Sequence, residues 1–340
     1  MKVGILGAGA LGTITGALIS ENGYDVDLID EYKAHVEALN ESGATLTGFI
    51  DRNIPVHAVQ TDELSEQYDV IFLLTKQVYT KEALQTIMPY LHEDSIVCTL
   101  QNGIPEELVA SIVGRERTLG GAVGFGATFT KPGVSSLTTE LAVMKKYAFE
   151  IGELDGSITE RLKVIKAILD SVGYCELTTN IIGLKWTKLL MNTTFSGMSA
   201  ALGCTFGEVL HNGTAMNVLA NIADETIKVA RAHGVQLVKM QGEDLSQLEL
   251  KNPTDIPDKL PIYNKVWSPH VNLKASMLQD IEKGKQTEVD FINGIVVEKG
   301  KEVGIPTPFN KRVYNLIKKA HEKKENSEYI EELHYLAEIL

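Results

Sequence analysis

The stretch GAGALG, residues 7–12, follows directly on the short apolar run KVGIL, residues 2–6, and decides the fold of this chain. The run is typical of a buried parallel strand, and residues 10–22 have the periodicity of a helix that ends at Gly23. A second predicted strand, residues 24–29, ends at Asp30. A strand, a glycine-rich turn, a helix and an acidic residue after the next strand form the fingerprint of a dinucleotide-binding βαβ unit.

Each glycine of this motif has its own predicted task. Gly7 permits the tight turn, Gly9 lets the backbone approach a pyrophosphate, and Gly12 lets the helix pack close to the strand. The start of the helix then offers unpaired N–H groups and a positive dipole end to the phosphates. The alternative is a glycine-rich turn that binds no ligand.

Composition limits the class of protein. The chain has 340 residues, 44% of them hydrophobic and 23% charged, as expected for a globular protein of two domains. A formal net charge of −13 argues against a general binder of nucleic acid or of anionic membranes. No apolar run reaches the length of a membrane span, and a strand that starts at residue 2 leaves no room for an N-terminal signal.

The cysteines Cys98, Cys175 and Cys204 form no close-spaced pair. A sparse, odd set indicates a reducing compartment and no metal site, and we expect a cytoplasmic protein. Cys98 and Cys175 lie in strand-like runs and are interpreted as core residues.

Strands and helices alternate through the first half of the chain. Further strands are predicted at 69–74, 95–100 and 118–130, another within 140–152, and two extended runs within 44–61. Further helices are predicted at 32–40, 80–88, 105–113 and 157–172. This alternation predicts an α/β fold with a Rossmann-type, doubly wound parallel sheet, and we assign residues 1–179 to a dinucleotide-binding domain.

Helical periodicity dominates the second half, so residues 180–340 are assigned to an all-α domain that carries the substrate and catalytic residues. Helices are predicted at 183–200, 213–233, 270–283, 286–303, 308–322 and 327–339. The polar, proline-containing stretch 241–265 is interpreted as a surface excursion. The last helix is expected to dock on this domain, and it would be available for a homodimer interface.

One helical stripe in the second half carries the candidate chemistry. Lys188 and Asn192 are four residues apart and share a face, which Ser196 continues, while Lys185 lies one turn earlier. An ammonium group beside a carbonyl that accepts hydride can stabilise the developing alkoxide and donate a proton to it. An asparagine can fix the lysine or orient the substrate. The alternative for such a lysine is a solvated surface charge.

A second segment adds Ser276 and Glu288. Ser276 can donate a hydrogen bond to a substrate carboxylate, and Glu288 can bind a substrate hydroxyl and favour the charged form of a neighbouring lysine. Either residue can instead cap or decorate a helix.

The residues after the second strand bear on the type of cofactor. Carboxylates at Asp30 and Glu31 would bind ribose hydroxyls and repel a 2′-phosphate, which favours NAD over NADP. Lys33 and Lys76 are the counter-evidence, because either can reach toward a 2′-phosphate.

The order of these motifs resembles the ketopantoate reductase (2-dehydropantoate 2-reductase) family. The matching segments run from residue 1 to about residue 322: GAGALG at 7–12, LQNG at 100–103, WTKLLMN at 186–192, SMLQDI at 276–281, TEVDFING at 287–294 and GIPTP at 304–308. The resemblance implies Lys188, rather than Lys185, as general acid, substrate binding by Asn192 and Ser276, and contact of Glu288 with the substrate hydroxyl. It implies Asn102 near the nicotinamide ribose and Lys76 near the adenosine phosphate.

Three residues depart from the family pattern. Ser196 and Phe206 stand where the family has asparagines, which leaves open a 2-keto acid other than ketopantoate. Glu31 stands where the family commonly has an arginine, which opposes its usual use of NADPH. The stretch 241–265 also makes the chain longer than is typical of the family.

These observations lead to one hypothesis: NAD(P)H-dependent reduction of a 2-keto acid, ketopantoate first, in pantothenate biosynthesis. The proposed catalytic residues are Lys188 and Glu288, the substrate-binding residues Asn192, Ser196 and Ser276, and the cofactor-binding residues Gly7, Gly9, Ala10, Leu11, Gly12, Asp30, Glu31, Lys76 and Asn102. The alternatives are a dehydrogenase of the same plan for another 2-keto, hydroxy or opine-type acid, and a non-catalytic dinucleotide sensor.

Two further patterns are interpreted as unrelated to the chemistry. Tyr314 and Lys318 have the Tyr-x-x-x-Lys spacing of short-chain dehydrogenases, but they lie beyond the sheet-forming half, on a predicted surface helix. His270 has no carboxylate partner in a motif and is interpreted as structural. No cluster in the sequence has metal-ligand spacing.

Overall fold

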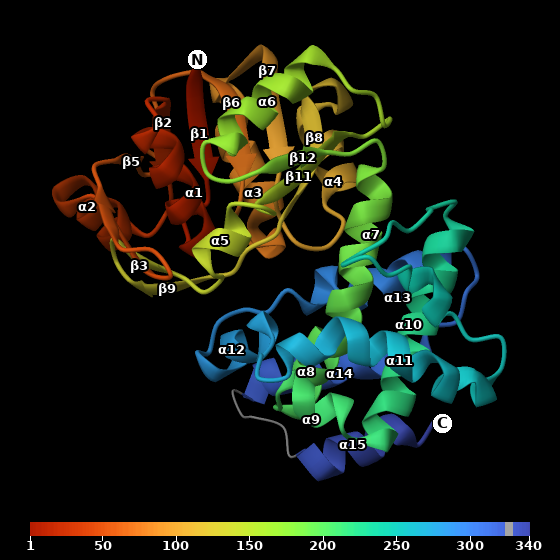
Figure 1. Cartoon of the computed structure of the whole chain (residues 1–340). Coiled ribbons are helices and arrows are strands. Elements are labelled where there is room, and N and C mark those ends of the chain that lie inside the picture. The colour runs from red at the N-terminus through yellow and green to blue at the C-terminus, as the bar shows by residue number, and fades with distance from the viewer. Residues whose placement is uncertain (324–328) are drawn as a thin grey trace. The chain divides into compact units, whose positions relative to one another are not determined.

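The computed structural model describes residues 1–323 and 329–340. The chain divides into two compact units, Met1–Ile182 and Gly183–Leu340, and each is described by itself. Figure 1 shows an α/β first unit and a second unit built of helices.

The first unit is built on an eight-stranded sheet with the strand order β12-β11-β8-β7-β6-β1-β2-β5. Its strands are β1 (Lys2–Leu6), β2 (Asp25–Ile29), β5 (His57–Val59), β6 (Tyr68–Leu73), β7 (Leu91–Thr99), β8 (Thr118–Val123), β11 (Phe149–Glu153) and β12 (Cys175–Leu177). Neighbouring strands are parallel except for β8 and β11, which pair antiparallel. The predicted fold class is confirmed, with the direction of β11 and β12 as an added detail.

Helices cover both faces of this sheet because its strands are apolar on both sides. The helices of the unit are α1 (Ala10–Glu21), α2 (Lys33–Ser42), α3 (Thr80–Ile87), α4 (Glu106–Val113), α5 (Leu141–Met144) and α6 (Glu160–Asp170). Val70 and Phe72 pack in one core with α1 and α6, whereas Ile71 and Leu73 pack in the other with α3 and α4. Alternate residues of β6 therefore face opposite layers, as a doubly wound sheet requires.

A small second sheet has the order β4-β3-β10-β9. Its strands are β3 (Ala44–Gly48), β4 (Arg52–Ile54), β9 (Ala127–Lys131) and β10 (Val134–Leu137). The strand predicted at 118–130 is therefore two strands, β8 and β9, in two different sheets, with two glycines in the intervening Gly124–Gly126. The strand predicted within 140–152 is β11, at the end of that range, and α5 precedes it.

The second unit is helical in its described residues, apart from one isolated bridge between Met240 and Glu243. Its helices are α7 (Ile181–Met191, beginning in the first unit), α8 (Gly197–Leu202), α9 (Phe206–Leu210), α10 (Gly213–Ala232), α11 (Ile256–Trp267), α12 (Ser276–Glu282), α13 (Asn293–Glu302), α14 (Pro308–Lys323) and α15 (Tyr329–Ala337). The predicted helix 183–200 is interrupted by a π-helical segment, Asn192–Ser196. The first residues of the predicted helix 327–339 lie outside the described residues.

The interpretation of 241–265 as a surface excursion is wrong. Leu245 and Leu248 are fully buried, and α11 buries Tyr263 and Trp267. Trp267 stacks on Phe195 with 4.7 Å between ring centroids, so the segment is part of the core of the second unit. The apolar residues recur at helical spacing, but prolines and charges between them conceal the pattern.

All three cysteines are free and buried, as expected for Cys98 and Cys175 in the strands of the core. Among the described residues, no helix is long and apolar enough to cross a membrane.

Candidate active site

The glycine loop between β1 and α1 is held by backbone packing at two of its three glycines. Gly7 has φ +97°, and a Cβ there would lie 2.5 Å from the backbone nitrogen of Thr75. A Cβ at Gly12 would lie 2.1 Å from the carbonyl oxygen of Gly7. At Gly9, in contrast, a Cβ would meet no described atom within 4 Å. Packing therefore requires glycine at 7 and 12, whereas at Gly9 glycine keeps the backbone accessible.

The loop places the start of α1 beside the end of β2. The N–H groups of Gly7 and Ala8 both donate to the carbonyl oxygen of Ile29, at 2.9 and 3.1 Å. Gly9 is the N-cap of α1, so this helix start has no side-chain cap. The first N–H groups of a helix have no intrahelical acceptor, and the helix dipole adds positive potential there. This helix start is suited to an anion such as a phosphate.

The predicted adenosine-end residues lie directly after β2. The carboxylate of Asp30 accepts the N–H of Tyr32 at 2.9 Å, which fixes its orientation, while Glu31 is exposed. Lys33 is exposed and pairs with Glu37 at 3.8 Å on α2. Lys76 is half-buried and comes after β6, at the same edge of the sheet.

Gln101 is a positioning residue of this edge that was not predicted from the sequence. Its amide group donates to the carbonyl oxygen of Thr75 at 2.8 Å and to the hydroxyl of Thr80 at 2.8 Å. It thereby ties the loop after β7 to the loop after β6. The carbonyl of the next residue, Asn102, accepts a hydrogen bond from the side chain of Gln77. A buried polar residue directly after an apolar strand is the signal that points to such a role.

Lys188 lies half-buried in the last turns of α7, and Lys185 is fully buried one turn earlier. Burial, together with the neighbouring charge of Lys185, lowers the pKa of Lys188 to about 8. The hydroxyl of Thr187 donates to the carbonyl of Gly183 at 2.8 Å and accepts the N–H of Val238 at 3.0 Å, which anchors α7. An ammonium group with such a pKa can give up a proton near neutral pH.

The π-helical segment directly after α7 carries Asn192 and Ser196, both half-buried. A π turn is rare and frequently marks a functional site. The hydroxyl of Thr194 donates to the carbonyl of Leu190 at 2.7 Å, and the amide of Asn293 donates to the carbonyl of Thr193 at 3.0 Å. These bonds supply side-chain donors to carbonyl groups in and next to the irregular turn.

Ser276 is the first residue of α12, and Glu288 follows this helix in the sequence. Ser276 is exposed in the first turn of α12, and α12 packs against the π-helical segment. The N–H of Ala275 donates to the hydroxyl of Ser199 in α8 at 3.1 Å, which fixes the start of α12. Glu288 is buried and comes directly before a short 3₁₀ turn, Val289–Phe291.

The structure thus places the predicted site residues in two groups. The cofactor-binding candidates lie in the first unit, at the ends of β1, β2, β6 and β7. The catalytic and substrate-binding candidates lie in the second unit. There α12 packs against the π-helical segment that follows α7, whereas Glu288 precedes the 3₁₀ turn that packs against α13 and α14. Among the described residues, no group of histidine, cysteine, aspartate and glutamate side chains is arranged to hold a metal ion.

The Tyr314 and Lys318 pair has a structural explanation. The hydroxyl of Tyr314 donates to Asp290 at 2.8 Å, and the ammonium group of Lys318 lies 3.2 Å from the same carboxylate. The pair joins α14 to the 3₁₀ turn after Glu288. His270 is half-buried, and burial lowers its pKa.

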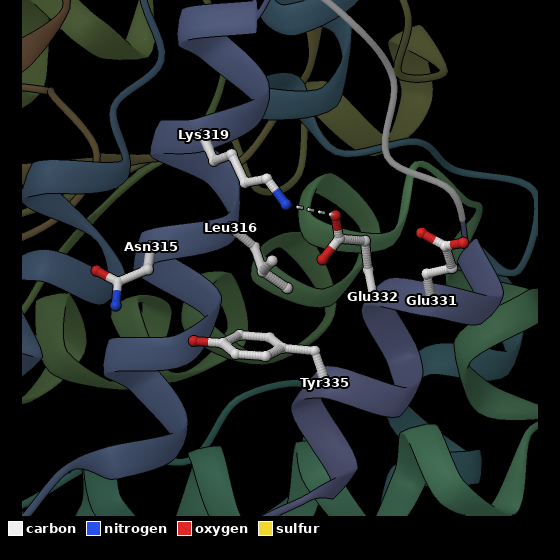
Figure 2. A pocket seen from close by; sticks show the side chains of 6 residues that line it. All are labelled: Asn315, Leu316, Lys319, Glu331, Glu332 and Tyr335. Carbon is white, nitrogen blue, oxygen red and sulfur yellow. Dashed lines mark ion pairs between the residues drawn. The ribbon is translucent and has the colours of Figure 1, made fainter.

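A surface hollow of about 370 Å³ lies between α14 and α15 and contains none of the predicted site residues. Figure 2 shows Lys319 of α14 facing Glu332 of α15 across it, at 3.5 Å, with Tyr335 beneath. It is lined by Asn315, Leu316, Lys319, Glu331, Glu332 and Tyr335.

Comparison with protein families gives two matches that together cover most of the chain. Residues 3–155 match the model "Ketopantoate reductase PanE/ApbA", and residues 180–321 match "Ketopantoate reductase PanE/ApbA C terminal". A 2-dehydropantoate 2-reductase of Pyrococcus horikoshii is 32% identical over 320 residues, covering 94% of this chain and 97% of that protein. Another, of Archaeoglobus fulgidus, is 30% identical over 318 residues, covering 93% and 97%.

Solved structures with the same fold include two relatives at a TM-score above 0.8. A D-mandelate dehydrogenase in a ternary structure with NADH and anilino(oxo)acetate has a TM-score of 0.82 and 26% identity, covering 95% of this chain and 99% of that one. A ketopantoate reductase family protein of Ralstonia eutropha JMP134 has a TM-score of 0.81 and 24% identity, with the same coverage. At that identity the second match supports the fold alone.

Proposed function

Because the chain belongs to the ketopantoate reductase family, and is therefore an NAD(P)-dependent oxidoreductase acting on CH–OH groups, we propose that it reduces the 2-keto group of 2-dehydropantoate with Lys188 as general acid. The observation that carries the role of Lys188 is its lowered pKa, about 8, on a helix that ends in a π turn bearing Asn192. Such a lysine is charged at neutral pH and still acidic enough to give up its proton.

The reaction combines a ketone, a hydride and a proton to give an alcohol. The reduced nicotinamide, when bound, supplies the hydride to C2. The negative charge that develops on the keto oxygen is stabilised by the ammonium group of Lys188, which then donates its proton to that oxygen. We assign Asn192, Ser196 and Ser276 to the binding of the substrate and Glu288 to its hydroxyl group and to keeping Lys188 charged.

The glycine loop fits a dinucleotide. The accessible backbone at Gly9 and the uncapped start of α1 suit the pyrophosphate, and the carboxylate of Asp30 suits the adenosine ribose. We assign Ala10 and Leu11 to the same helix start, and Lys76 and Asn102 to the remainder of the cofactor site. We propose NADH as the preferred cofactor, since Asp30 and Glu31 together disfavour a 2′-phosphate.

A second candidate is a dehydrogenase of the same plan for another 2-keto acid. Phe206, which replaces a family asparagine, is half-buried, and its ring lies 5.7 Å from that of Phe195 in the π-helical segment. An apolar ring adjoining this segment suits a substrate with an apolar substituent better than one with a hydroxyl group. The similar D-mandelate dehydrogenase, bound to anilino(oxo)acetate, supports keeping this candidate.

The deciding experiment measures consumption of NADH and NADPH with a panel of 2-keto acids: 2-dehydropantoate, branched aliphatic 2-keto acids and an aryl 2-keto acid. The first proposal predicts the highest kcat/KM for 2-dehydropantoate, whereas the second predicts it for an apolar 2-keto acid. Cofactor binding without turnover of any 2-keto acid would overturn both.

A further inference from the structure

His35, a buried histidine of α2, contacts the glycine loop through its ring. Its Nδ1 atom accepts the backbone N–H of Gly133 at 2.9 Å, and its Nε2 atom lies 2.7 Å from the carbonyl oxygen of Ala8. A backbone N–H can only donate, so Nδ1 carries no proton in this arrangement. The proton of the neutral ring is therefore on Nε2, and it is donated to the Ala8 carbonyl.

The same carbonyl has a second donor. The hydroxyl of Thr13, in the first turns of α1, donates to the Ala8 oxygen at 2.7 Å. Both His35 and Thr13 are fully buried. Two donors from α1 and α2 thus fix the direction of one carbonyl group in the middle of the loop.

The direction of this carbonyl also fixes the N–H of Gly9. A peptide group is planar and trans, so the Ala8 carbonyl and the Gly9 N–H point in opposite directions. Because the carbonyl points to His35, the Gly9 N–H points away from the imidazole ring. Gly9 is also the residue whose missing Cβ leaves the backbone accessible, with no described atom within 4 Å.

His35 is itself held from the side of the small sheet. Gly133 lies in the turn between β9 and β10, and the ring of Phe129 in β9 packs edge-on against the imidazole ring at 5.0 Å. The small sheet thereby determines the position of the ring, and the ring determines the orientation of the Ala8–Gly9 peptide. This arrangement gives the small sheet a role beyond packing.

We propose that His35 is a positioning residue for the cofactor, which orients the Gly9 N–H to donate to the pyrophosphate of the dinucleotide. The proposal rests on the function proposed above. An oriented backbone N–H binds an anion without the cost of reorganising the loop, so its loss weakens cofactor binding and leaves the chemical step intact.

Two substitutions separate positioning from general structural support. The amide nitrogen of glutamine reaches the place of Nε2, so His35→Gln keeps the donor to Ala8 and loses the acceptor for Gly133. Asparagine reaches only the place of Nδ1, so His35→Asn keeps the acceptor for Gly133 and loses the donor to Ala8. Each variant loses the contacts on one side of the same ring, and on the Nε2 side these include the hydroxyl of Thr13 at 3.2 Å as well as the Ala8 carbonyl.

The measurements are the dissociation constants of NADH and NADPH by fluorescence titration, with kcat at saturating cofactor. We expect His35→Asn to weaken binding of both cofactors about tenfold with kcat unchanged, and His35→Gln to stay within about threefold of the native protein. Equal weakening in both variants, or native binding in His35→Asn, would overturn the proposal.

A second variant keeps the test decisive if His35→Asn does not fold. Thr13→Val removes the other donor to the Ala8 carbonyl with little change in shape, so it should also weaken binding of both cofactors. Native affinity in Thr13→Val would then count against the proposal. Failure of the proposed function would be distinct, since the native protein would bind dinucleotide and reduce no 2-keto acid.

Discussion

At the scale of single residues, alanine substitutions at Gly9 and Gly12 should differ in their effect on stability. A Cβ at Gly9 meets no described atom within 4 Å and the backbone φ is −63°, so Gly9→Ala should fold with a native Tm. The added methyl group would lie where the pyrophosphate is proposed to approach, so the cofactor KM should rise about tenfold or more. Gly12→Ala should lower Tm as well, because its Cβ would lie 2.1 Å from the Gly7 oxygen. Thermal unfolding and cofactor kinetics check the pair; native cofactor KM in Gly9→Ala would contradict the assignment.

The pH dependence of catalysis follows from Lys188. The ammonium form is the acid, and its pKa is about 8, so kcat for keto acid reduction should be constant below pH 8 and fall above it. Oxidation of the corresponding hydroxy acid needs the neutral amine, so its kcat should rise up to about the same pH. Profiles of kcat against pH for keto acid reduction and for hydroxy acid oxidation check these opposite trends.

Lys185 provides the control for this assignment. Its charge contributes to the low pKa of Lys188. Lys185→Met should therefore retain activity, and the pH above which kcat falls should be higher than in the native protein. Loss of activity in this variant, with the fold intact, would identify Lys185 as the acid instead.

The cofactor preference depends on charge at Glu31. This residue is exposed, so Glu31→Arg should leave Tm unchanged while it replaces a repulsive charge with an attractive one for a 2′-phosphate. We expect kcat/KM for NADPH relative to NADH to rise about tenfold. The native protein should favour NADH, and a native preference for NADPH would contradict the argument from Asp30 and Glu31.

At the scale of elements, the π-helical segment depends on Asn293. Its amide group donates to the carbonyl of Thr193 and to the side-chain oxygen of Asn310, both at 3.0 Å. Asn293→Asp replaces this donor with an acceptor that faces two acceptors. The free energy of unfolding should fall by about 2 kcal/mol or more. Urea unfolding measures it, with Asn217→Asp on the exposed face of α10 as control; equal stability of the two variants would contradict this role.

The sequence predicted elements well where one periodicity extended over a whole element. The strand Lys2–Leu6 and the helix Gly213–Ala232 lie where their apolar patterns placed them. Prediction failed where the determining contact is distant in sequence. The break between β8 and β9 depends on pairing of β9 with β10, and the packing of 241–267 depends on the ring of Phe195. The π turn could not be predicted, because the carbonyl of Thr193 is satisfied by a residue 100 positions later.

At the scale of the whole molecule, the two units carry different parts of the proposed reaction. The dinucleotide motif in the first unit and the lysine stripe in the second were both evident in the sequence because each is local. The supporting roles of Gln101 and His35 were not, because the sequence around a single polar residue does not reveal its partners. Gln101 meets Thr75 and Thr80 only in the folded unit. The same holds for His35 and its partners Ala8 and Gly133.

The central claim is that this protein reduces a 2-keto acid with Lys188 as the proton donor. The most direct test compares kcat of the native protein and of Lys188→Ala for the best 2-keto acid of the panel, at saturating reduced cofactor. The account predicts a loss of about 10²–10⁴ in kcat with an unchanged dissociation constant for the cofactor. A kcat in Lys188→Ala within about threefold of the native value would contradict it.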